Sequence, residues 1–161
     1  MQPNKSITFF FFKKKPSTIH LALHFACENG HLNVVRELLN KGAFVHAASN
    51  TGETALMLAS RHGHLDVVKE LLEKGAKVEA HSSVSNTALM LAAYSGHVEV
   101  VNELLKAGAN PEDKNVQRLT ARQLAKQRGH KDVVKIFDAL ERGKRSASRS
   151  TVSSTASTSS K

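Results

Sequence analysis

The sequence predicts an all-α fold: a solenoid of four helix-turn-helix units joined by short hairpin-like loops. Gly-His pairs recur at a fixed step of 33 residues, and they begin at Gly30, Gly63, Gly96 and Gly129. Val-Val pairs keep the same step, and they begin at Val34, Val67, Val100 and Val133. A step repeated at several registers is typical of stacked supersecondary units. Such units bury their apolar faces against their neighbours.

The second unit, residues 48–80, shows how each unit is built. Thr54 precedes the apolar run Ala55–Ala59, and its hydroxyl suits the N-cap of a first helix. A second run, Leu65–Lys74, carries apolar residues at helical spacing on one face. Gly75 then ends the second helix, because glycine adopts the left-handed conformation at low cost. We therefore expect two short helices and a polar, turn-like loop in each unit.

The expected helices are too short to stand alone. Each has only about ten residues, and isolated helices of that length are marginal in water. The units must therefore stack into one shared core. We expect this repeat domain to span residues 17–140, with units at about 17–47, 48–80, 81–113 and 114–140.

The last unit departs from the others in a way that indicates a terminal cap. Arg122 replaces the leucine found at positions 56 and 89, and Asp138 replaces Leu72. No Gly-Ala pair follows its second helix, although the three earlier units end in such pairs. A terminal repeat with a polar outer face keeps the end of a solenoid soluble. We therefore expect the array to end with this unit.

Four segments open the expected first helices, and they read Leu21-Ala-Leu-His24, Thr54-Ala-Leu-Met57, Thr87-Ala-Leu-Met90 and Thr120-Ala-Arg-Gln123. With the Gly-His and Val-Val pairs behind them, they resemble the ankyrin repeat family, whose units open with Thr-Pro-Leu-His. The resemblance implies a turn and two antiparallel helices per unit. It also implies a hydrogen bond between the opening threonine and histidine, but no unit here keeps both residues. Methionine fills the histidine's volume apolarly, so we expect the fold to survive with weaker polar stitching.

The two ends of the chain differ from the repeat domain. Residues 1–16 are expected to be a poorly ordered extension, or sequence from a mis-called exon boundary that stands in place of upstream repeats, since they contain homopolymeric runs at Phe9–Phe12 and Lys13–Lys15. The alternative is that the phenylalanines fold back as a cap on the first unit. Residues 141–161 form a basic Ser/Thr-rich tail, a composition that predicts disorder.

The net charge of +9 is distributed unevenly along the chain. Residues 17–140 hold 14 basic and 13 acidic side chains, whereas the two tails hold 9 basic and one acidic. Residues 114–135 hold 7 basic and one acidic side chain, so the last unit is basic. Basic tails on a nearly neutral body are weak support for nucleic-acid binding, which we keep as the alternative function.

The sequence offers no catalytic or metal-binding constellation. Four of the nine histidines recur once per unit. Stacking separates them by about 8–10 Å, and ligands of one zinc ion lie about 2 Å from the metal. No glycine-rich phosphate loop and no nucleophile signature is present, and Cys27, the only cysteine, is expected to be a buried thiol. We expect no enzyme activity, no cofactor and no metal.

The resemblance implies that a partner protein binds the concave face, on the hairpin tips and the exposed side of the first helices. The matching positions are Asn50, Thr51, Glu53, Arg61, His62, His81, Ser83, Val84, Asn86, Tyr94, Ser95, Val116, Gln117, Leu119, Gln127 and Arg128. Tyr94 stands out because it is the only tyrosine and tyrosine is enriched at binding hot spots. Val84, Val116 and Leu119 are expected to give it an apolar neighbourhood.

The expected function is a non-enzymatic protein–protein interaction module, as an adaptor or scaffold or as a fragment of a larger ankyrin protein. The alternative is a nucleic-acid-associated regulatory protein that uses the basic last repeat and the tails. No stretch approaches the roughly 20 apolar residues of a membrane span. We expect a monomer in the cytoplasm, with the nucleus as a second location because Lys13–Lys15 and Arg142–Arg145 are basic clusters.

Overall fold

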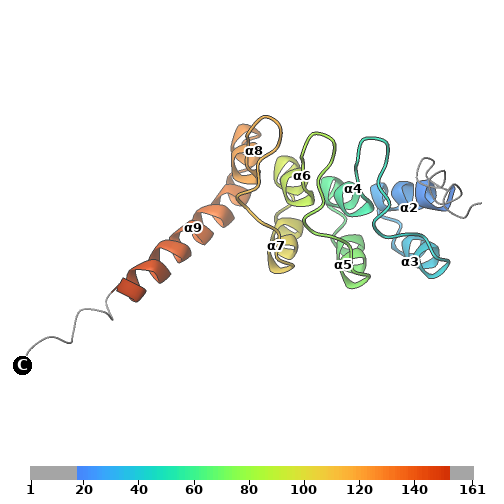
Figure 1. Ribbon diagram of the computed structural model, residues 1–161, viewed down its shortest axis with the longest axis horizontal. Helices are drawn as coiled ribbons and strands as arrows, with labels where there is room; N and C mark the ends of the chain where they lie inside the picture. The colour runs from blue at the N-terminus through green and yellow to red at the C-terminus, as the bar shows by residue number, and fades with distance from the viewer. Residues whose placement is uncertain (1–17, 153–161) are drawn as a thin grey trace, which may run out of the picture.

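The computed structural model of the protein describes residues 18–152, with side chains through residue 147 (Figure 1). The predicted extension at residues 1–16 lies outside the described residues, as do residues 153–161 of the tail. Within the described range the regular structure is helical, apart from one isolated β-bridge between Ala48 and Thr54. The predicted all-α fold class is confirmed.

The helices alternate between two rows (Figure 1). The first helices of the units are α2 (Thr18–Glu28), α4 (Ala55–His62), α6 (Ala88–Ser95) and α8 (Ala121–Gln127). The second helices are α3 (Leu32–Asn40), α5 (Leu65–Glu73), α7 (Val98–Lys106) and α9 (Lys131–Val152). Each first helix lies beside the next first helix and beside its own second helix, so the chain forms an elongated stack of helical hairpins.

Local capping explains where the first helices begin and end. The Thr54 hydroxyl accepts a hydrogen bond from the Met57 amide at 3.4 Å, and the Thr87 hydroxyl accepts one from the Met90 amide at 3.3 Å. These contacts satisfy amides that have no partner within the helix. Gly63 ends α4 with a φ of 76°, a left-handed conformation that glycine adopts without strain. The predicted threonine cap of the second unit is confirmed.

The core lies between units more than within them. Val67, Val100 and Val133 are each 1% exposed, and all three occupy the same position of the 33-residue step. Met57 and Met90 are also buried, at the position where the family has histidine. They fill this space with apolar atoms, as expected from the sequence.

The Gly-His pairs join each unit to the one before it. The Nε2–H groups of His64, His97 and His130 each donate to a backbone carbonyl of the preceding unit at 2.9 Å. Each ring also packs against the glycine of the Gly-His pair in the preceding unit. For example, a Cβ added at Gly63 would lie 2.5 Å from Nδ1 of His97. The polar stitching between units therefore comes from a different histidine than the one in the family's opening segment. The one opening-segment histidine that the chain keeps, His24, is buried and donates to the carbonyl oxygen of Ala47 at 2.9 Å.

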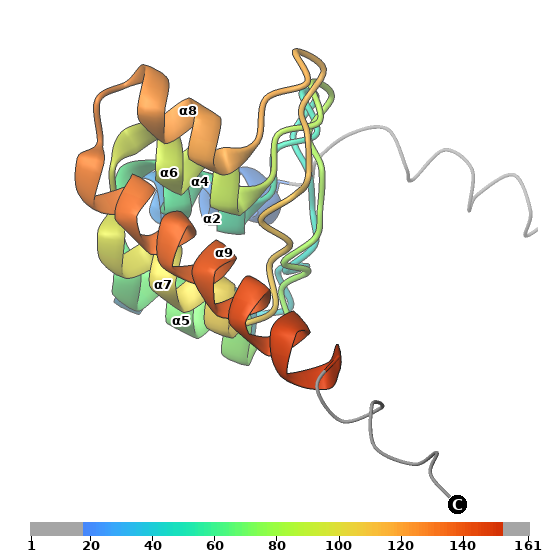
Figure 2. The same cartoon turned by 90° about the vertical axis from the view of Figure 1, so that its left-hand side faces the viewer.

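The loops between units stack along one side of the helices (Figure 2). The Ser83 amide donates to the carbonyl oxygen of Thr51 at 2.9 Å, and the Val116 amide donates to that of Val84 at 3.2 Å. These bonds join the tips of successive loops. They fix the loop tips relative to one another, which gives the array one continuous and ordered edge.

The prediction that residues 141–161 are disordered is wrong for residues 141–152, because α9 continues to Val152. Leu140, Glu141 and Arg142 are good helix formers and extend the helix beyond the packed unit. Lys144 then forms an ion pair with Glu112 at 3.6 Å, which ties the extended part of α9 back to the preceding loop. The serines that made the tail resemble a disordered segment begin only at residue 146.

Candidate partner-binding surface

The sixteen predicted partner-binding residues lie on α4, α6, α8 and the loops that precede them, apart from Arg128, which directly follows α8 as its C-cap. None of them is buried. Five are half-buried, and these are Glu53, Arg61, Asn86, Ser95 and Leu119. Leu119 packs partly against the core, and neither it nor Val84 or Val116 lines the hollow beside Tyr94, so the expected apolar neighbourhood of Tyr94 is supplied by other residues. Val84 and Val116, by contrast, are exposed as expected.

Some of these residues surround a hollow of about 320 Å³ between the first helices and the loop tips. Its lining residues are Arg61, Asn86, Met90, Leu91, Tyr94, Ser95, Asn115, Gln117 and Leu124. The deep part is apolar, since Met90, Leu91 and Leu124 are buried. The remaining residues place hydroxyl, amide and guanidinium groups around it. We call this site the Tyr94 hollow.

Tyr94 combines exposure with a fixed position at the hollow. Its side chain is 40% exposed, which agrees with the expectation that it need not be buried. The guanidinium carbon of Arg128, which caps α8 in the next unit, lies 4.4 Å from the centre of the tyrosine ring. A cation over an aromatic face is attractive, so this contact holds the ring across the junction between two units.

Several predicted residues are positioned by ion pairs on the same surface. Arg61 pairs with Glu53, which joins the end of α4 to the loop before that helix. His62 lies 3.7 Å from a carboxylate oxygen of Glu28, and His81 lies 3.6 Å from one of Asp113. Each of these two contacts carries an opposite charge only when the histidine is protonated. The pair between Arg61 and Glu53 therefore ties α4 to its preceding loop at this surface.

Asn115, which was not predicted from the sequence, organises the loop before α8. Its side-chain oxygen accepts bonds from the amides of Gln117 and Leu119 at 3.0 Å each. Its amide nitrogen donates to the side-chain oxygen of Asn86 at 3.1 Å. The sequence held a signal for this role, because Ser82 and Ser49 stand one and two steps earlier at the same position, and their hydroxyls also accept hydrogen bonds from backbone amides.

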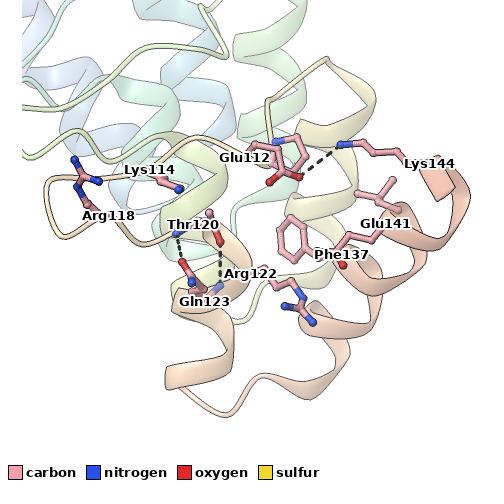
Figure 3. A pocket seen from close by; sticks show the side chains of 11 residues that line it. Glu112, Lys114, Arg118, Thr120, Arg122, Gln123, Phe137, Glu141 and Lys144 are labelled. Carbon is pink, nitrogen blue, oxygen red and sulfur yellow. Dashed lines mark hydrogen bonds and ion pairs between the residues drawn. The ribbon is translucent and has the colours of Figure 1, made fainter. Parts of the chain in front are cut away.

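A second, basic crevice of about 290 Å³ lies at the outer face of the last unit (Figure 3). Lys114, Arg118, Arg122 and Lys144 contribute four cationic side chains, against the carboxylates of Glu112 and Glu141. Its base is Phe137, which is buried. At its edge the Thr120 hydroxyl accepts from the Gln123 amide and the Gln123 side chain accepts from the Thr120 amide, a capping box that begins α8.

Other features that bear on chemistry are few among residues 18–152. No group of three or more His, Cys, Asp or Glu side chains gathers there in an arrangement that could hold a metal ion. Burial raises the pKa of the Cys27 thiol to about 12, so the thiol stays protonated near neutral pH. No helix in that range has the length and apolar character needed to cross a membrane.

The repeat geometry defines a class of protein, the helical solenoid built from stacked hairpins. A family model described as ankyrin repeats (3 copies) matches residues 4–82, and one described as ankyrin repeat matches residues 85–116. The chain belongs to the ankyrin repeat family. No curated protein matches its sequence. Ankyrin repeats are generally protein–protein interaction modules.

Proposed function

We propose that this chain is a non-enzymatic binding module, an adaptor or scaffold or part of a larger ankyrin protein, whose partner protein docks over the Tyr94 hollow. The observation that supports this proposal is an apolar hollow bordered by a half-exposed tyrosine. An apolar side chain of the partner would enter the hollow and contact the Tyr94 ring. The polar rim formed by Asn86, Ser95 and Gln117 would bond to the partner's backbone.

The order of this surface favours binding. Loop tips that are already hydrogen-bonded to one another lose little conformational freedom when a partner binds. The Arg128 contact likewise restricts the Tyr94 ring before any partner arrives. Tyrosines in such fixed, partly apolar settings are frequent hot spots, where truncation to alanine costs about 2 kcal/mol or more.

The test measures partner affinity with two matched variants. A partner is captured with the full chain, identified by mass spectrometry and purified, and its affinity is measured by titration calorimetry. Tyr94→Ala should weaken binding about 30-fold, which corresponds to about 2 kcal/mol. Phe44→Ala is the control, because Phe44 is also an exposed aromatic residue but lies outside the hollow.

Circular dichroism accompanies both measurements. Unchanged helicity with a selective loss of affinity in Tyr94→Ala supports the proposal. Equal affinities of the two variants would place the partner elsewhere on the array. Loss of helicity with unchanged affinity per folded molecule would show that Tyr94 serves the core instead.

The basic crevice favours a second candidate function, nucleic-acid binding. Among the described side chains, those of Lys114 and Arg118 form no ion pair, so both are available to phosphate groups. Phosphate contacts give a linear fall of log affinity with log salt concentration. A steep slope that becomes shallower in a Lys114→Glu, Arg118→Glu variant would support this second function. An affinity for nucleic acid that neither salt nor the variant changes would exclude it.

A further inference from the structure

The first unit exposes an apolar surface. In every later unit, the corresponding surface is covered by the preceding unit. This surface, which we call the leading face, consists of Leu21, Phe25, Val34 and Leu38. Phe25 is 64% exposed and Val34 is 48% exposed. The residues one step later, Leu58 and Val67, are 8% and 1% exposed. The difference shows that the leading face has the shape and chemistry of an interface between units.

Polar groups at the same end show the same pattern. His31 is exposed and its ring has no hydrogen-bond partner among the described residues, whereas His64 donates to the carbonyl of Glu28 in the unit before it. Glu37 is likewise exposed, whereas Glu70, one step later, accepts from Arg36 at 2.7 Å. The first unit thus carries both the apolar and the polar halves of an interface.

We propose that the leading face is a docking surface and that its occupant is the chain's own segment Ile7–Phe12. This segment holds one isoleucine and four consecutive phenylalanines, with Thr8 as its one polar residue. It precedes the start of α2 at Thr18 by a five-residue connection. That connection spans up to about 20 Å when extended, and packed helices lie about 8–10 Å apart. The segment can therefore reach Val34 on α3.

Charge and composition support this occupant. Lys13–Lys15 follow the phenylalanines directly and have the charge opposite to the exposed carboxylate of Glu37. Burying five large apolar side chains against the leading face removes apolar area from water on both surfaces. The segment lacks the Gly-His pair of a complete unit. It would therefore cover the apolar half of the interface and leave His31 in solvent.

The experiment uses the full chain with a photoreactive benzoylphenylalanine in place of Phe11. Irradiation at low protein concentration, followed by mass spectrometry of the peptides, should give an intramolecular cross-link to α2 or α3. A cross-link between two molecules would show that a second copy occupies the face. A cross-link to α6–α9, or none, would show that the segment does not dock there. Each of these three results, a cross-link between molecules, a cross-link to α6–α9 or no cross-link, overturns the proposal.

Two pairs of substitutions check that the cross-link depends on the leading face. Phe25→Ser with Val34→Ser should abolish the cross-link, and both side chains are exposed enough that the fold should persist. Val84→Ser with Val116→Ser, at 47% and 63% exposure, is the matched control and should retain it. A cross-link that survives in the first variant while circular dichroism shows an intact fold would also overturn the proposal.

Discussion

At the N-terminal end of the array, Phe25 and Val34 stand on the outer face with nothing packed over them among the described residues. At the C-terminal end, the corresponding outer face carries Arg122 and Asp138, which pair at 2.6 Å in place of two leucines. The N-terminal face is therefore apolar, like an interface between units, whereas the C-terminal face is polar, like an ordinary protein surface. Both ends consist of a pair of helices, so the difference between them lies in the outward-facing side chains.

The comparison also explains how each unit depends on its neighbours. In the inner units the outward-facing positions are apolar because another unit covers them, as Val67 and Val100 show. In the last unit an ion pair can replace leucine, since nothing stacks on that side among residues 18–152. The contribution of a residue to the stability of the array therefore depends on whether a neighbouring unit contacts it.

The largest effect is expected from Phe137, the buried residue beneath the C-terminal surface. Phe137 is 3% exposed, and Phe137→Ala should lower the free energy of unfolding by about 3–5 kcal/mol, because the lost ring leaves a cavity. Leu38 occupies the same position in the first unit but is only half-buried, so Leu38→Ala should cost less. Urea denaturation measures both values. Equal losses would mean that the N-terminal end is as well packed as the C-terminal one.

The second largest loss of stability is expected when an inner glycine is replaced, and the last glycine serves as the comparison. Gly63 and Gly129 both have left-handed φ values, so alanine should cost about 1–2 kcal/mol at either position. Gly63→Ala additionally forces the His97 ring to move, whereas nothing lies within 4 Å of a Cβ at Gly129. Overpacking of this kind adds about 1–3 kcal/mol. Thermal unfolding that ranks the two variants equally would show that the ring yields without cost.

The third effect concerns the histidines that join the units. His97→Ala removes the hydrogen bond to the Arg61 carbonyl and should cost about 1–3 kcal/mol, since that carbonyl loses its partner. His31→Ala at the open end should change stability by less than about 0.5 kcal/mol, as is usual for exposed residues. The measurement is again urea denaturation. A comparable loss at His31 would reveal a partner that covers the first unit.

The smallest change in stability, but a change in assembly, is expected when the C-terminal ion pair is replaced. Arg122→Leu with Asp138→Leu should alter the free energy of unfolding by less than about 1 kcal/mol, because half-exposed ion pairs contribute little. Once the segment Ile7–Phe12 is also deleted from the chain, the new apolar surface would complement Phe25 and Val34 of another molecule, and such head-to-tail contacts form open chains. Sedimentation velocity should then detect concentration-dependent oligomers. A variant that stays monomeric would show that the two ends do not match.

The fold was predictable because a 33-residue step repeats at many positions, and each repetition constrains the same unit. Thr54 as a cap and Tyr94 as an exposed residue followed from their places within that step. The pairing of Arg122 with Asp138 did not, since the sequence shows two lost leucines but not that they face each other. The contact between Tyr94 and Arg128 depends likewise on the rotation of one unit against the next.

The end of α9 and the role of Asn115 were missed for different reasons. Composition averaged over residues 141–161 hid the end of α9, which continues through Ser146, Ser148 and Ser150 to Val152. Asn115 was predictable in principle, because Ser49 and Ser82 precede it at the repeat step, but its amide bonds arise only once the loop has folded. Partner binding by the sixteen surface residues stays a prediction.

The contact between each glycine and the histidine of the next unit has a consequence for how the length of the protein can change. Excising residues 64–96 would join Gly63 to His97 and present Gly30 with the ring of His97 in place of the ring of His64. A deletion one residue longer or shorter would place a different side chain against that glycine. We therefore expect the array to tolerate insertion or deletion of whole 33-residue units. Each such change lengthens or shortens the exposed edge of loops and keeps the glycine–histidine contacts between units.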